Sequence, residues 1–405
     1  MKRRLEEALC SDKVVSTIEV RETVLEDEVI DAIVNLIWKG NVETVQLDDC
    51  GAYMNKQAIS MARALGNCKY VRLSEPTFLT TNFLAEFLLS STKLETLRIQ
   101  DRLLAPQVDA LAKGLKSNIT LRTLDLSKSR VENIGALAQG LRDNTSLTNI
   151  KLRSVGLHDE DMAILLSSLE SRPTLENLDL SFNHLRNLTP LGCLLRSPNS
   201  CLKELLIGFQ NMWQVPRTNI VPILEAMKEN TTLTALGMAN NKLRDEDAEM
   251  LLVALSENST LESLDLRGNL FHDRGVLHIA RLVKESKSLR KLLVVKNPFG
   301  SEGSLALLEA TRTNHRIIHM DVCCKNIRYN TALNRGGRCL LMETPKPPLA
   351  LWPLAMERAN NIDWGEEGST HFAQPSGTLV DPRIDVLYHF LQKSPVIFEG
   401  MICDS

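Results

Sequence analysis

The sequence predicts an α/β solenoid of about twelve repeats, each a short strand followed by a helix. One apolar position recurs at spacings of 26 to 31 residues over most of the 405-residue chain. Within each repeat, apolar residues first alternate with polar ones and then recur at steps of three or four. Alternation is typical of a strand with one buried face, and the longer step is typical of a helix. A period of this size indicates stacked repeats rather than separate ordinary domains.

The strand part of a repeat is clearest at residues 261–269, where Leu264 and Leu266 alternate with polar residues. Both side chains are therefore expected on the core side of the strand. Downstream of Asn241, apolar residues recur at helical spacing and predict a helix on the outer side. The corresponding first apolar position of each repeat is Val15, Val42, Cys68, Leu94, Leu121, Leu147, Leu175, Leu202, Leu233, Leu261, Leu289 and Ile317.

Two series of asparagines repeat with the same period. The first series is expected to pair backbone groups where the chain leaves the strand, and its members are Asn183, Asn241, Asn269 and Asn297. The second series lies in Asn-x-Ser/Thr sequences at the predicted helix ends, and its members are Asn118, Asn144, Asn230 and Asn258. We predict that these four are structural left-handed residues that end the helices rather than glycan acceptors.

The pattern Leu-x-x-Leu-x-Leu-x-x-Asn/Cys, with this spacing, resembles the ribonuclease-inhibitor-like subfamily of leucine-rich-repeat proteins over roughly residues 14–325. The resemblance implies a leucine-rich-repeat horseshoe solenoid with an inner parallel sheet, outer helices and a non-repeat C-terminal cap. The subfamily includes the repeat domains of nucleotide-binding immune receptors and the Ran GTPase-activating protein. An extended concave surface is the usual binding face of such an array.

Three regions are predicted. Residues 1–40 form an N-terminal cap and a degenerate first repeat, with a helix over Glu26–Lys39. Residues 41–325 hold the leucine-rich repeats. Residues 326–405 form a C-terminal cap, with a helix that begins at Asp381 and ends before Pro395. An alternative for this last region is a second partner-binding module.

Composition and motifs exclude several classes of function. The net charge of −3 gives no basic footprint for nucleic acid, and no apolar run reaches membrane-spanning length. Glu6 and Glu7 stand where a secretory signal would have its apolar stretch, so we expect a cytoplasmic protein. We also expect it to be a monomer. Phosphate-loop, HExxH and GxSxG motifs are absent from the sequence, so we predict no enzyme and no cofactor. The nine cysteines form no CxxC and are expected as reduced thiols. One polar cluster is interpreted as terminal-repeat surface rather than a metal site: His315, His319, Asp321, Cys323 and Cys324.

A candidate partner-binding surface lies on the inner face. In the first half this face is charged, with Arg98, Asp125 and Arg153 as examples. In the middle it is apolar, and the longest spacing of 31 residues predicts an enlarged rim loop over residues 210–219. The apolar candidates are Phe182, Leu206, Phe209, Met212 and Trp213. The alternatives are a merely solvated charged face and a Trp213 side chain that fills a local void.

The sequence therefore predicts a non-catalytic scaffold that binds a protein partner of unknown identity on its concave face. Surface aromatic residues are common anchors of protein interfaces. The alternative is a GTPase activator of the Ran type, because that family shares the architecture. The acidic tail typical of that family is missing, since residues 395–405 contain only Glu399 and Asp404 as acids.

Overall fold

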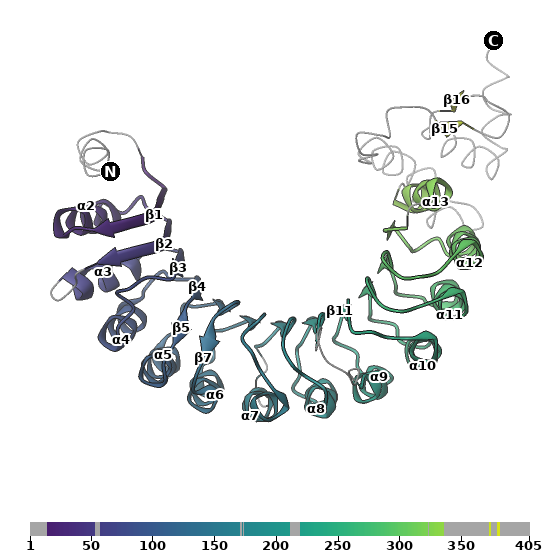
Figure 1. Ribbon diagram of the computed structural model, residues 1–405, viewed down its shortest axis with the longest axis horizontal. Coiled ribbons are helices and arrows are strands. Elements are labelled where there is room, and N and C mark those ends of the chain that lie inside the picture. Colours follow the sequence, from purple (N-terminus) through teal and green to yellow (C-terminus); the bar gives the residue numbers. More distant parts are fainter. Residues whose placement is uncertain are drawn as a thin grey trace, which may run out of the picture. The chain divides into compact units, whose positions relative to one another are not determined.

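The computed structural model describes residues 14–52, 57–170, 172, 174–210, 219–322, 324–335, 372–373 and 379–380 (Figure 1). The chain divides into two compact parts, a first part over Met1–Gly237 and a second part over Met238–Ser405. Residues 1–13, the predicted rim loop and the predicted helix after Asp381 lie wholly or almost wholly outside the described residues.

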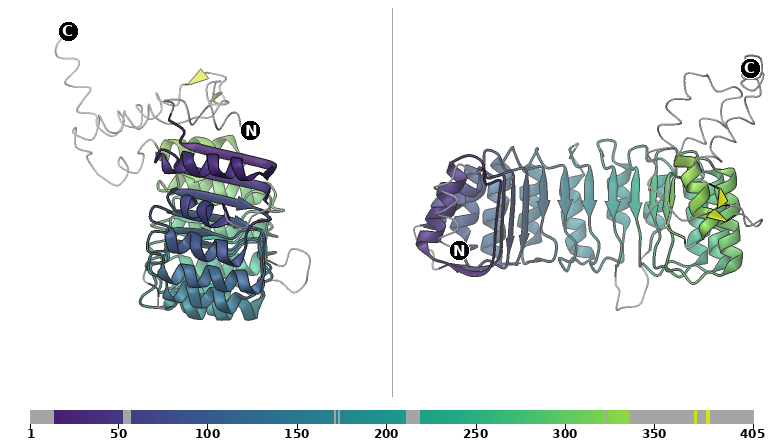
Figure 2. Two further views of the ribbon diagram at one scale, coloured as in Figure 1. Left: turned by 90° about the vertical axis from the view of Figure 1, so that its left-hand side faces the viewer. Right: turned by 90° about the horizontal axis from the view of Figure 1, so that it is seen from above.

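In the described residues of the first part, nine strands pair in parallel in chain order. They are β1 (Thr17–Leu25), β2 (Thr44–Ala52), β3 (Tyr70–Ser74), β4 (Thr96–Gln100), β6 (Thr123–Asp125), β8 (Asn149–Lys151), β9 (Asn177–Asp179), β10 (Glu204–Leu206) and β11 (Ala235–Gly237). Two short strands pair separately, β5 (Arg102–Leu103) and β7 (Arg130–Val131). Figure 2 shows the sheet strands side by side.

A helix follows nearly every strand of this sheet. The helices of the first part are α2 (Asp27–Trp38), α3 (Gln57–Leu65), α4 (Thr81–Ser90), α5 (Ala105–Ser117), α6 (Ile134–Asp143), α7 (Asp159–Leu169), α8 (Thr189–Arg196) and α9 (Val221–Met227). They lie on the outer side of the curve of this part, and the strands lie on its inner side (Figure 1). Side chains fix some helix starts: Thr80 accepts from the Phe83 amide, and Asn133 accepts from the Ala136 amide.

The second part repeats the same alternation. Its strands β12 (Ser263–Asp265), β13 (Lys291–Leu293) and β14 (His319–Met320) pair in parallel. Its helices are α10 (Asp245–Leu255), α11 (Asp273–Glu285), α12 (Ser301–Thr313) and α13 (Lys325–Arg335). Two further short strands pair antiparallel, β15 (Phe372–Ala373) and β16 (Leu379–Val380). Residues 326–335, predicted to belong to the cap, are thus helical, and the predicted boundaries 1–40, 41–325 and 326–405 stay predictions.

The core follows the predicted period. From Val42 to Ile317, each predicted first apolar position is at most 4% exposed, whereas Val15 is only half-buried. Leu264 and Leu266 are fully buried, as their alternation predicts. The predicted helix over Glu26–Lys39 is confirmed by α2, for which Glu26 is the N-cap residue. The predicted α/β solenoid with strands on the inner side and helices on the outer side is confirmed.

The asparagines after the strands have the predicted role. Asn183 is 1% exposed and its side-chain oxygen accepts the amides of Val155, Gly156 and Leu157. Asn269 accepts the Leu243 amide in the same way. These bonds satisfy backbone groups where the chain leaves one strand and turns toward the next helix.

The asparagines at the helix ends differ from the prediction. Asn118 and Asn144 are not left-handed: both have φ of −80° and an extended backbone. The side chain of Asn118 explains this, because its oxygen accepts the Thr120 and Leu121 amides while its amide donates to the Leu88 carbonyl of the preceding repeat. The turn is thus closed by the side chain instead of by a left-handed residue. All four asparagines of this series are at most 7% exposed, which disfavours glycosylation.

Helix packing between repeats depends on a close approach at Gly140. A Cβ there would lie 2.6 Å from the Ala112 Cα of helix α5, whereas a Cβ at Gly135 of the same helix α6 would meet nothing nearer than 3.6 Å. We expect Gly140→Ala to lower the free energy of unfolding by about 1–3 kcal/mol through overpacking. Gly135→Ala is the matched control and is expected to raise it by up to about 1 kcal/mol through helix propensity. Urea unfolding of both variants measures this, and equal effects would contradict the role of the close approach.

Candidate functional site

The inner face of the first part carries rows of side chains that lie in register across the strands. One row runs through Arg72, Arg98, Asp125, Lys151 and Asp179, with each residue paired to the next across neighbouring strands. Alternate residues of a strand point to the same face of the sheet, so the members of the row stand beside one another on the inner face. The row continues to Leu206 and Gly237. The predicted candidates Arg98, Asp125 and Leu206 therefore belong to one row.

The charges at the N-terminal end of this face largely neutralise one another. Arg98 Nε lies 3.6 Å from Asp125 Oδ2, and Arg72 Nε lies 3.1 Å from Asp48 Oδ1. These are charge contacts without an aligned hydrogen bond from either Nε atom. Exposed or half-buried pairs of this kind contribute little to stability. Arg98 and Asp125 are thus already paired with each other, and they are weaker candidates for a partner contact than unpaired charges.

A second feature of the inner face is a turn residue with positive φ directly after the strands. In the first part these residues are Lys128 (66°), Ser154 (57°), Phe182 (62°) and Phe209 (60°), and the same position holds Asn240 (56°), Gly268 (64°) and Lys296 (63°) in the second part. Left-handed backbone favours glycine and asparagine and costs other residues about 1–2 kcal/mol. Phenylalanine in two consecutive repeats is therefore not explained by the backbone, and its side chain must supply the reason.

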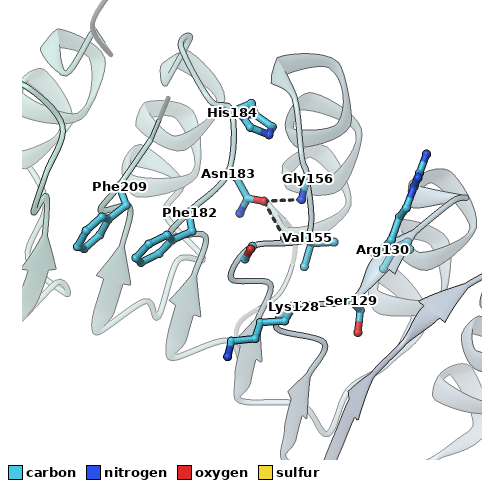
Figure 3. Close-up of a pocket in the computed structure, with 11 residues that line it drawn as sticks. Lys128, Ser129, Arg130, Val155, Gly156, Phe182, Asn183, His184 and Phe209 are labelled. Atoms are coloured by element: carbon cyan, nitrogen blue, oxygen red, sulfur yellow. Dashed lines mark hydrogen bonds between the residues drawn. The ribbon is translucent and has the colours of Figure 1, made fainter. Parts of the chain in front are cut away.

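The two phenylalanines form the centre of the site. The rings of Phe182 and Phe209 are stacked, with centroids 4.0 Å apart and an interplanar angle of 13° (Figure 3). The guanidinium carbon of Arg153, from the preceding repeat, lies 4.1 Å from the Phe182 ring centroid. Both rings are half-buried. Arg153, Phe182 and Phe209 therefore form a three-layer stack across three repeats, combining a cation–π contact with an aromatic pair.

The structure brings together three of the predicted site residues, Arg153, Phe182 and Phe209, and places a fourth, Leu206, nearby. Leu206 is half-buried on strand β10 and lies over Gly237, where a Cβ would be 2.7 Å from Leu206 Cδ2. Met212 and Trp213 lie outside the described residues, so their place in the site stays a prediction.

A groove of about 510 Å³ runs beside this stack, which we call the turn groove. It is lined by Lys128, Ser129, Arg130, Val131, Ser154, Val155, Gly156, Phe182, Asn183, His184 and Phe209. These residues come from four consecutive repeats, and Figure 3 shows Arg130 at the end opposite to Phe209. The amides of Val155 and Gly156 donate to Asn183 Oδ1, and these bonds fix part of the wall of the groove.

The turn groove is basic. Its lining holds Lys128, Arg130 and His184 but no carboxylate. Among the described residues, neither Lys128 nor Arg130 forms an ion pair, whereas five other arginines near the sheet do: Arg21, Arg72, Arg98, Arg102 and Arg267. Arg130 and His184 were not predicted as site residues from the sequence, because neither interrupts the repeat pattern. The signal that would have found them is the alignment of the turn positions after each strand.

The most strongly shifted titratable groups lie away from this groove and have structural causes. Burial raises the pKa of the Cys68 thiol to about 12 and lowers the pKa of Arg172 to about 10. Asp321, from the polar cluster near the last strand, accepts the amides of Val294 and Val295 through Oδ1. Asp321 aligns with Leu293 of the neighbouring strand, and its carboxylate accepts the Val294 amide in the way that the Leu293 carbonyl accepts the Leu266 amide. In the part of the chain that the structure describes, no three His, Cys, Asp or Glu residues form a group able to hold a metal ion.

Two family models for leucine-rich repeats match parts of this chain. The model described as TMOD/LMOD Leucine-rich domain matches residues 194–333, and a Leucine Rich repeat model matches residues 117–138. An internalin from Listeria monocytogenes is 18% identical, with a TM-score of 0.44, and the match covers 80% of this chain and 90% of that one. A structure of leiomodin-1 actin-binding site 2 is 20% identical, with a TM-score of 0.30, and the match covers 33% of this chain and 78% of that one.

The repeat pattern, the parallel sheet and the matched repeat models together define a leucine-rich-repeat protein of the α/β class. Proteins of this class present their strand side chains and turns as a surface for other molecules. Among the described residues, no helix combines the length and the apolar character that crossing a membrane requires.

Proposed function

We propose that this protein is a non-catalytic interaction scaffold that binds a protein partner on its inner face, at the stack of Arg153, Phe182 and Phe209. The observation that carries the proposal is a pair of half-exposed phenylalanines on backbone that favours glycine. Left-handed conformations at bulky residues persist where the surrounding structure imposes them and often mark functional sites. Aromatic residues and arginine are enriched in protein interfaces.

The stack is also well prepared for binding. Phe182 is held between two neighbours, and the backbone around it is fixed by the Asn183 bonds and by the bond from the Phe182 amide to the Gly208 carbonyl. A partner would therefore pay little ordering entropy to dock on these rings. Truncation of an anchor of this kind typically costs an interface at least 2 kcal/mol.

We expect Phe209→Ala to weaken partner binding at least about tenfold while the free energy of unfolding changes by less than about 2 kcal/mol. Affinity capture from a lysate of the source cells, followed by titration of the purified partner, measures the binding. Lys296→Ala is the matched control, because Lys296 lies at the same turn position in the second part and is exposed. If Phe209→Ala retains all partners with unchanged affinity, the proposed function is wrong.

Actin is a second candidate partner. The TMOD/LMOD model matches residues 194–333, a range that includes Phe209, and the leiomodin-1 fragment carries actin binding in its name. Cosedimentation of the full chain with filamentous actin, and pyrene-actin assembly for monomers, would test it.

GTPase activation of the Ran type is the alternative function. It is tested by measuring GTP hydrolysis by a panel of small GTPases with and without the chain. We also propose that the protein belongs to the ribonuclease-inhibitor-like subfamily, is located in the cytoplasm and is a monomer.

A further inference from the structure

We infer that the turn groove takes a short acidic peptide segment of the partner, with its carboxylates beside Lys128 and Arg130 and an apolar side chain against Phe182 and Phe209. The inference rests on the proposed function and adds the chemistry of the ligand. It is carried by three features of the groove: its charge, its length and the arrangement of its two ends.

The lining of the groove carries positive charge only. Of the nearby carboxylates, Asp125 contacts Arg98 and Glu132 bonds Arg102, while Asp101 and Asp179 accept backbone amides and form no ion pair among the described residues. Lys128 and Arg130 have no carboxylate partner among the described residues. In a chain with a net charge of −3, a groove with two free cations and no acid is a local exception. Charge complementarity of this kind selects an anionic ligand and speeds its association.

The length of the groove fits a few residues of extended chain. Lys128, Ser154, Phe182 and Phe209 occupy the same turn position in four consecutive repeats. Neighbouring parallel strands are about 4.8 Å apart, so three steps span roughly 14 Å. An extended peptide covers about 3.3 Å per residue, so four or five residues reach from one end to the other.

The two ends of the groove differ in chemistry. Figure 3 shows Arg130 at one end and the stacked Phe182 and Phe209 rings at the other. Val155 and Gly156 line the wall between these ends (Figure 3). The ligand that matches carries acidic groups at one end and an apolar side chain about four residues away. A sulfated or phosphorylated residue could supply the same negative charge, and the test therefore includes a phosphopeptide.

Single-stranded nucleic acid fits this groove less well. Such ligands bind by stacking bases on exposed aromatic faces. Both faces of Phe182 are already covered, one by Arg153 and the other by Phe209. We therefore favour a peptide.

The probe is a set of fluorescent peptides with two carboxylates and one leucine, separated by one to five residues, measured by anisotropy with the full chain. We expect saturable binding that is best at a separation of three or four residues and is lost when both carboxylates become amides. Binding should weaken at least about tenfold in the double variant Lys128→Glu/Arg130→Glu. The charge-matched control Lys113→Glu/Lys287→Glu changes two exposed lysines outside the groove and should bind like the parent chain.

Four outcomes overturn the inference: no carboxylate-dependent binding at millimolar peptide, equal loss in both double variants, preference for a phosphopeptide over every carboxylate peptide, or stronger binding of a short single-stranded RNA. Its failure is distinguishable from failure of the proposed function. If partner capture needs Phe209 but survives Lys128→Glu/Arg130→Glu, only the acidic ligand is wrong. If capture is also unchanged in the Phe209→Ala variant, the proposed binding surface is wrong as well.

Discussion

Asn183→Ala is expected to lower the free energy of unfolding by about 3–5 kcal/mol. The side chain is 1% exposed, and its oxygen accepts three backbone amides at 3.0 to 3.1 Å. Its amide donates to the carbonyls of Leu152 and Leu180, both at 2.8 Å. Each buried backbone group left without a partner costs about 1–3 kcal/mol, and water that enters the vacated space recovers part of this.

The loss is measured by urea unfolding followed by circular dichroism. Asn187→Ala is the control, because Asn187 is exposed and its side chain accepts the Thr189 amide; we expect a change below about 1 kcal/mol there. Similar losses in the two variants would show that the buried network is not what holds the turn. Because a solenoid is stabilised by contacts between neighbouring repeats, the variant is also expected to unfold in more than one step.

Arg172→Ala is the second large effect, with an expected loss of about 2–4 kcal/mol. Arg172 is 4% exposed and donates to the carbonyls of Leu141 and Leu147, at 2.9 and 3.1 Å. It stands where Asn118 and Asn144 stand in the preceding repeats, three residues before the first apolar position. Its removal leaves the end of helix α6 and the following strand without these donors.

Arg172→Asn tests that equivalence, and we expect it to keep the unfolding free energy within about 1 kcal/mol of the parent chain. Burial lowers the pKa of Arg172 to about 10, so the unfolded chain holds the proton more tightly. Ionisation of this group therefore opposes folding below pH 10, and the cost is relieved as the pH rises above 10. Asparagine makes the corresponding bonds without a buried charge. A loss in Arg172→Asn as large as in Arg172→Ala would contradict the shared role.

Much of the fold could be predicted because the period is a direct consequence of stacking. Residues such as Leu264 and Leu266 must alternate wherever a strand has one buried side, and this pattern is visible without any coordinates. The end of each helix was less predictable. Asn118 offers two solutions, a left-handed backbone or a side chain that closes the turn, and the choice depends on the Leu88 carbonyl of another repeat.

The site was predictable in part for the same reason. Phe182 and Phe209 stand out as aromatic residues after strands, so their proximity follows from the register. The pairing of Arg98 with Asp125, rather than with a ligand, depends on rotamers that a period does not determine. Arg130 and Arg172 were missed because each replaces an ordinary member of a series without disturbing the spacing.

At the turn positions after the strands, the backbone hydrogen bonds do not depend on which side chain the residue carries. The amides of Lys128, Ser154 and Phe182 each donate to a carbonyl of the next repeat, whatever side chain the residue carries. The main chain is therefore anchored independently of residue type, and the positions tolerate lysine, serine, phenylalanine, asparagine and glycine at nearly the same φ. Binding preference can thus be rewritten one residue at a time along this edge while the ladder of backbone bonds stays intact, which makes these turns suitable sites for engineering or evolving new specificity.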